Sequence, residues 1–252
     1  MTVVTLCTEL GALDEHFVTQ LARCLGTEIV DHRWFERHML DCMDAGDGEV
    51  FDLVKGQSTM SRHWDMNTRQ LARQTSEEIL EVAARGNVLI ISSAAAAILR
   101  PIRHVLSLRV RAPIDVRLHN VMQRLAYADV RMAQWEIESV DAAHARYMQR
   151  VFDIDWQSPD LYDLVLNTER VPLGQWLEPV SRLAQCAQFE VTPASYAELC
   201  SRQRAFQLLD TQHAIKTSAG DAAITIVPDG VSLPGADLPK EAIAAVEPRL
   251  RH

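Results

Sequence analysis

Short apolar runs alternate with helical patterns along the first 190 residues, and this alternation constrains the fold more than any other feature. The runs at 3–6, 88–91 and 104–110 are almost continuously apolar, as in strands that are covered on both faces. Stretches with apolar residues three and four apart follow them, which is the spacing of a helix that packs on a sheet. The pattern predicts an α/β domain with a parallel sheet covered by helices on both faces, and ligands at the carboxyl edge of that sheet.

The first such unit has the layout of a phosphate-binding loop. Residues 5–26 read TLCTELGALDEHFVTQLARCLG, which is a strand, a turn with one glycine, and an amphipathic helix from Asp14 to a stop at Gly26. A phosphate loop needs glycines and a cation in the turn, but this turn carries acids. Asp14 is therefore expected to cap the helix, and with Glu15 it would repel a phosphate there.

From residue 191 the chain changes character. A helix to about His213 precedes two short strands, AITIV and VSLPG, which the turn PDG joins, and a helix follows at 239–250. We expect a separate small α+β module over 191–252, after a main domain over 1–190. The hairpin resembles the centre of a BON-type domain, a resemblance that implies binding of lipids or partner proteins, and a generic appendage is the alternative.

Composition excludes several classes of protein. Hydrophobic residues make up 48% of the 252 residues and charged residues 23%, which indicates a folded protein, and a net charge of −9 argues against a broad nucleic-acid-binding face. The five cysteines form no C-x-x-C pair and the nine histidines no metal-binding spacing, so no metal site is expected. No apolar run approaches the roughly 20 residues that span a bilayer. We expect a cytoplasmic protein without a transmembrane segment.

Three segments together resemble the cytidylate-kinase-like proteins, a branch of the P-loop nucleoside monophosphate kinases. They are residues 5–26, NVLIISSAAAAILRPIRHVLSLRVRAPIDVRLHNVMQR at 87–124, and ARYMQRVFDIDWQSPDLYDLVLNTERV at 145–171. The resemblance covers about residues 2–187 and implies a P-loop kinase sheet. It also implies an acceptor-binding insertion at 31–64, a helical lid at 125–150, and ATP with Mg²⁺ as cofactors if the protein is an active kinase.

The phosphate-binding segments depart from the family pattern. The family typically has a Gly-Ser-Gly-Gly-Arg loop after Ser-Arg-Glu, and this chain keeps only Glu9 and Gly11 of it. Where relatives tend to carry Gly-Arg-Gly, this chain has Ser92, Ser93 and four alanines. The serines could hold a phosphate, but helix capping is favoured.

The resemblance also supplies candidate site residues. Those for phosphate binding are Gly11, Ser92, Ser93, Arg117, Arg124, Arg146 and Arg150, and those for the acceptor are Asp31 and Arg33. Arg146 and Arg150 share a helix face and could close on an anion, or could pair with Asp153 or Asp155. Asp31 could instead cap a helix. No residue is assigned a catalytic role.

An intact fold signature with a degenerate phosphate loop favours a pseudokinase. We expect a regulatory or assembly role with a protein partner or complex, in a protein that can still bind a nucleotide weakly. One alternative is an active ATP-dependent kinase for CMP, dCMP or another small molecule. The other is a structural subunit that docks on a larger complex through the C-terminal module.

Overall fold

The computed structural model describes residues 1–31, 64–125, 129–216, 225–227 and 230–232. The predicted acceptor insertion with Arg33, and the predicted helix at 239–250, lie outside these residues. The chain divides into two units, Met1–Gln207 and Leu208–His252.

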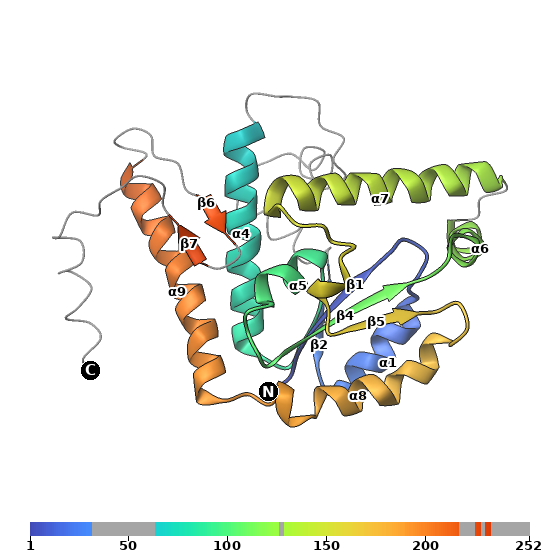
Figure 1. Cartoon of the computed structure of the whole chain (residues 1–252), viewed down its shortest axis with the longest axis horizontal. Helices are drawn as coiled ribbons and strands as arrows, with labels where there is room; N and C mark the ends of the chain where they lie inside the picture. The colour runs from blue at the N-terminus through green and yellow to red at the C-terminus, as the bar shows by residue number, and fades with distance from the viewer. Residues whose placement is uncertain (32–63, 126–128, 217–224, 228–229, 233–252) are drawn as a thin grey trace. The chain divides into compact units, whose positions relative to one another are not determined.

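A five-stranded parallel sheet forms the centre of the first unit, as predicted (Figure 1). Its strands are β1 (Val3–Thr8), β2 (Glu28–Val30), β3 (Val88–Ile91), β4 (Val105–Arg111) and β5 (Leu164–Asn167), in the order β2-β3-β1-β4-β5. Val3 lies opposite both Val88 and Val105, so the strands run in register. Their carboxyl ends therefore meet at one edge, where β1 and β4 are followed by the turns to α1 and α6.

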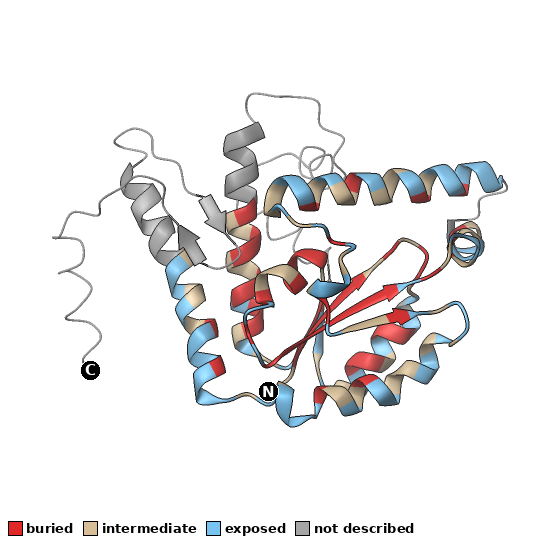
Figure 2. Cartoon of the chain, viewed as in Figure 1, coloured by how far each residue is buried: buried red, intermediate tan, exposed pale blue. Residues whose placement is uncertain are grey.

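Helices cover both faces of this sheet, as predicted (Figures 1 and 2). The α-helices are α1 (Glu15–Leu25), α4 (Trp64–Arg85), α5 (Ser93–Leu99), α6 (Ile114–Leu125), α7 (Val130–Phe152), α8 (Leu177–Ala184) and α9 (Pro193–Lys216). One core holds Ile79, Ala95 and Leu199, from α4, α5 and the start of α9. The other holds Phe17 and Val180, from α1 and α8. Two apolar cores explain why the strands are apolar on both sides.

The predicted helix caps are confirmed. The Asp14 carboxylate accepts a hydrogen bond from the Phe17 amide at 2.6 Å, and Gly26 ends α1 in the left-handed conformation at φ 65°. Ser92 accepts from the Ala95 amide at 3.4 Å and so caps α5. These side chains satisfy amide groups that the first turn of a helix leaves open.

Two predicted elements differ from those in the structure. The apolar run at 161–166 predicts a strand, but the strand begins only at Leu164, because Pro159–Leu161 forms a 3₁₀ turn. The residue pattern at 172–188 predicts one helix, but this region is divided into Leu173–Trp176, α8 and Ala187–Phe189, of which the outer two are 3₁₀ turns. Pro159 begins the first of these 3₁₀ turns, and Pro172 directly precedes the second. Proline favours the start of a helical turn because its φ is fixed and it lacks an N–H donor.

In the second unit, the strands β6 (Thr225–Val227) and β7 (Gly230–Ser232) pair antiparallel, with Val227 opposite Gly230. This pairing agrees with the hairpin expected around the PDG turn. The boundary between the units lies within α9, after Gln207. The domain boundary expected at 190/191 stays a prediction. The BON-type resemblance stays a prediction. In the part of the chain that the structure describes, no helix combines the length and apolarity needed to cross a bilayer.

Candidate functional site

The turn between β1 and α1 is closed on itself. The Ala12 amide donates to the Glu9 carbonyl at 3.0 Å, and Gly11 takes a positive φ of 82°. A Cβ on Gly11 would lie 2.7 Å from the Arg117 carbonyl oxygen and 2.9 Å from a methyl group of Val121. The glycine is therefore needed for close packing against α6, which differs from the role of a glycine that lets a backbone approach a phosphate.

The Glu9 carboxylate lies buried at the end of β1, between two arginines. One oxygen accepts from Nη2 of Arg109 at 2.8 Å, and the other accepts from the Ala112 amide at 3.3 Å. The second oxygen also lies 3.8 Å from Nη1 of Arg117. A buried carboxylate needs such partners, because an uncompensated charge in the interior is costly.

Arg117 joins the turn to the two helices α6 and α7. Both of its terminal nitrogens donate to Asp141 on α7 at 2.8 Å, and its Nε donates to the Leu10 carbonyl at 2.7 Å. Asn120, one turn further along α6, donates to the Gly11 carbonyl at 2.8 Å. The Arg117 side chain is 8% exposed, so its charge is surrounded by protein.

Arg109 is enclosed by aromatic rings as well as by Glu9. Its guanidinium carbon lies 4.9 Å from the centre of the Trp156 ring and 5.8 Å from that of Tyr162, distances at which cations are attracted to aromatic faces. The segment DIDW predicts a half-buried Trp156, but the residue is 1% exposed, because it packs over Arg109 and against the His144 ring. The Tyr162 hydroxyl donates to the Trp156 carbonyl at 2.7 Å, and burial raises the pKa of this phenol.

The two candidate serines after β3 have structural partners. Ser92 caps α5, and the Ser93 hydroxyl lies 3.0 Å from the Cys7 sulfur. Burial raises the pKa of the Cys7 thiol, which keeps it neutral and poorly nucleophilic.

The remaining candidates lie apart from the Glu9 cluster, which we define as Glu9, Arg109, Arg117 and Asp141. Arg124 is exposed in the last turn of α6, and Arg146 and Arg150 are exposed on α7. Asp31 follows β2 and is half buried. The structure thus brings Gly11 and Arg117 together, and the phosphate and acceptor assignments stay predictions.

Arg109 and Asp141 are not among the residues predicted from the sequence. For Arg109 a signal exists, because an arginine within the apolar strand VLSLRVR must find a partner if the strand is buried. For Asp141, a polar residue in a long polar helix, the sequence offers no comparable signal.

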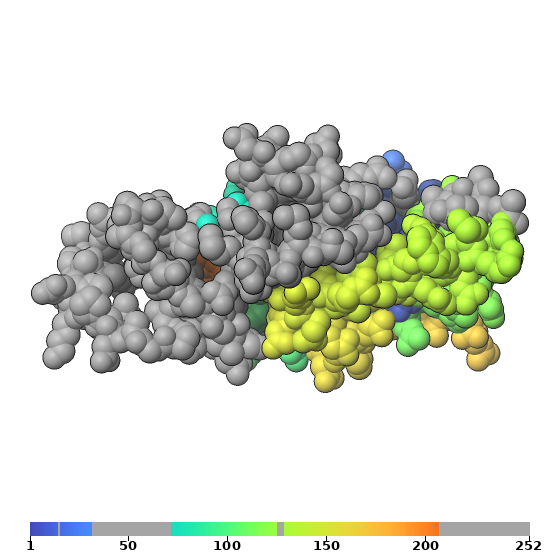
Figure 3. Space-filling model, turned by 90° about the horizontal axis from the view of Figure 1, so that it is seen from above, coloured from blue at the N-terminus to red at the C-terminus, as the bar shows by residue number. Residues whose placement is uncertain are grey.

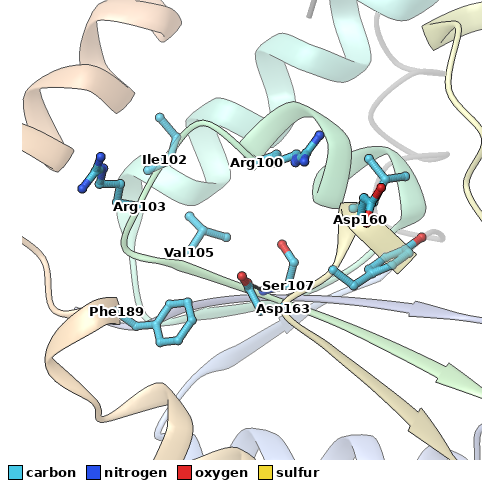
Figure 4. A pocket seen from close by; sticks show the side chains of 10 residues that line it. Arg100, Ile102, Arg103, Val105, Ser107, Asp160, Asp163 and Phe189 are labelled. Atoms are coloured by element: carbon cyan, nitrogen blue, oxygen red, sulfur yellow. Dashed lines mark hydrogen bonds between the residues drawn. The ribbon is translucent and has the colours of Figure 1, made fainter. Parts of the chain in front are cut away.

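A small pocket of about 120 Å³ lies at the opposite end of the strands (Figure 4). Its floor includes Val105 and Ser107 at the start of β4, where Asp163 accepts from the Ser107 amide at 2.7 Å. Among the described residues, no three His, Cys, Asp or Glu side chains are placed to hold a metal ion.

Solved structures resemble this chain to different degrees, and the first of them shares its fold. An uncharacterized protein from Eubacterium ventriosum has 14% identity and a TM-score of 0.57, with 73% of this chain and 97% of that chain covered. A shikimate kinase from Bacteroides thetaiotaomicron has 13% identity and a TM-score of 0.46, with 74% and 100% covered. A shikimate kinase from Acinetobacter baumannii, in complex with shikimate, has 11% identity and a TM-score of 0.44, with 73% of this chain and 92% of that chain covered.

No curated protein sequence matches the chain significantly. A family model does match, over residues 3–170, which include the whole sheet, the Glu9 cluster and α7. This match confirms the expected resemblance, and the chain belongs to the cytidylate kinase-like family.

Proposed function

We propose that this protein is a pseudokinase of the cytidylate kinase-like family, and that it acts as a regulatory or assembly partner. The observation that carries the proposal is the closed turn after β1, where Gly11 packs against α6 and the Asp14 carboxylate caps α1 in place of a bound anion. Next to this turn, the Glu9 carboxylate lies between Arg109 and Arg117.

The charges of the cluster favour this function. Phosphoryl transfer depends on cations that are free to stabilise the transferring group. Here two arginines face two carboxylates, Glu9 and Asp141, and the bidentate pair engages both terminal nitrogens of Arg117. A phosphate could use Arg117 only if this partly buried pair broke, which would leave Asp141 without its partner.

The backbone around the turn supports the same proposal. A phosphate loop offers several amide N–H groups and a helix N-terminus to the anion. In this turn the Ala12 amide is bonded to Glu9 and the Phe17 amide to Asp14. The Asp14 carboxylate also places negative charge at the end of α1 that would otherwise attract an anion.

Incubation of the full chain with ATP, Mg²⁺ and either CMP or dCMP tests this function. We expect no nucleoside diphosphate above the level of a sample without protein. Active kinases turn over at about 1–100 s⁻¹, and a rate in this range would overturn the proposal. Calorimetric titration with Mg²⁺-ATP adds a binding measurement, and an Arg117→Ala variant beside a control at the exposed Arg23, Arg23→Ala, would show whether any binding involves the turn.

A further inference from the structure

The outer face of α7 has an arrangement of charges that is complementary to itself. Along one stripe of the helix lie Trp135, Glu138, Ala142, Arg146 and Gln149, three or four residues apart, and all five are exposed. The buried residues of α7 include Ala133, Ile137 and Met148. Figure 2 shows the buried part of this helix on its side toward the sheet. Figure 3 looks onto the outer side of α7.

The stripe is symmetric about Ala142. Glu138 and Arg146 lie four residues before and after it, and Trp135 and Gln149 lie seven residues before and after it. If a second α7 packs antiparallel with the two alanines opposite each other, each Glu138 meets Arg146 of the other copy. A two-fold axis repeats every contact, so the interface would contain two such ion pairs.

The side chains of the stripe are available for these contacts. Arg146 makes no ion pair with any residue that the structure describes. Glu138 has one hydrogen bond, which its Oε1 accepts from Gln134 on the same helix at 2.8 Å. Ala142 carries a single methyl group, which allows two helices to approach closely at the crossing point.

Trp135 adds apolar area to the same face. It is 60% exposed, and the neighbouring Met132 is 51% exposed. Large apolar side chains that cluster on a surface commonly mark an interaction site, and tryptophan is prominent among residues that dominate binding energy. In the antiparallel arrangement, the Trp135 ring covers the aliphatic part of Gln149 from the second copy.

We propose that the protein associates with a second copy of itself through antiparallel pairing of the outer faces of α7. A single helix of 23 residues is about 35 Å long and offers a small interface, so the dimer is expected to be weak, with dissociation in the micromolar range. The proposal does not depend on whether the β1–α1 turn binds a nucleotide.

Sedimentation velocity on the full chain, over about two decades of micromolar concentration, is the first test. We expect a monomer that converts to a dimer, and Trp135→Ala should weaken association. A chain that stays monomeric throughout this range would overturn the proposal.

Reversing the charge of Glu138 or Arg146 tests whether the outer face of α7 forms the dimer. Glu138→Arg or Arg146→Glu alone places like charges at both symmetric contacts, and each should weaken the dimer at least tenfold, about 1.4 kcal/mol or more. Glu138 and Arg146 are too far apart on one helix to contact each other, so restored pairing in the doubly reversed chain would arise between chains.

Mixing the two single variants is the sharpest test. A Glu138→Arg chain has arginine at both positions and an Arg146→Glu chain has glutamate at both, so the two should form a mixed dimer although neither pairs with itself. Arg23→Glu on the exposed part of α1 is the matched control, and it should leave the dimer unchanged. A dimer that tolerates both α7 reversals would overturn the proposal.

Discussion

Arg117 on α6 and Asp141 on α7 form a bidentate ion pair, with both nitrogen–oxygen distances at 2.8 Å. The arginine also binds the Leu10 carbonyl in the turn after β1. One guanidinium therefore links α7 to the turn between β1 and α1.

Replacing Asp141 by Asn should destabilise the protein strongly. The change leaves the 8%-exposed Arg117 with only the more distant Glu9 as a negative partner, and loss of one member of a buried pair typically costs about 3–5 kcal/mol. Because Asp141 is partly exposed, we expect about 2–3 kcal/mol in urea unfolding. Glu198→Gln breaks the exposed pair with Arg202 and should change the free energy of unfolding by less than about 1 kcal/mol. Equal effects of the two changes would contradict this account.

Gly11→Ala should destabilise the turn by about 2 kcal/mol or more. The new methyl group would lie 2.7 Å from a backbone oxygen of α6, in a residue whose φ of 82° already disfavours a side chain. Gly174→Ala is the matched control, because a Cβ at Gly174 meets no atom within 4 Å. Thermal or urea unfolding of both variants checks the prediction, and a Gly11 variant as stable as the control would show that the turn is not packed as described.

The sheet could be predicted from the sequence because burial on both faces leaves its own pattern. Short apolar runs such as VVTL and VLII are typical of strands that are covered on both faces. The ends of α1 could also be predicted, because Asp14 caps its first turn and Gly26 adopts the left-handed conformation that ends it. The start of β5 was misplaced, since the apolar residues Leu161 and Tyr162 belong to a turn and a buried contact that precede the strand.

The Glu9 cluster could not be predicted in the same way. Arg109 reaches Glu9 across 100 positions of sequence, through the register of β4 beside β1. Asp141 reaches Arg117 only because α6 and α7 pack side by side. Such pairs depend on how the elements pack in the folded protein, and the spacing of residues along the chain does not predict this packing.

Cys7 should resist alkylation in the folded protein. Burial raises the pKa of its thiol, so the reactive thiolate stays scarce at pH 8, and the side chain is covered. Cys24 and Cys186 are exposed and serve as internal references. Timed iodoacetamide labelling with peptide mass spectrometry should show these two modified well before Cys7. Labelling of Cys7 at their rate would mean that the face between β1 and α5 opens readily.

His104 should make stability depend on pH below neutrality. Its ring is 1% exposed, and Nδ1 lies 2.9 Å from the Ser195 hydroxyl at the start of α9. Burial, and then the charge of the chain's amino terminus, lower the pKa of this imidazole below its usual 6.5. The unfolded chain therefore takes up the proton first, so the stabilisation is present above pH 6.5 and is lost as the pH falls through the folded-state pKa. Urea unfolding between pH 7 and pH 5 should show a decline that His104→Gln reduces, whereas parallel curves for the two proteins would contradict a buried neutral histidine.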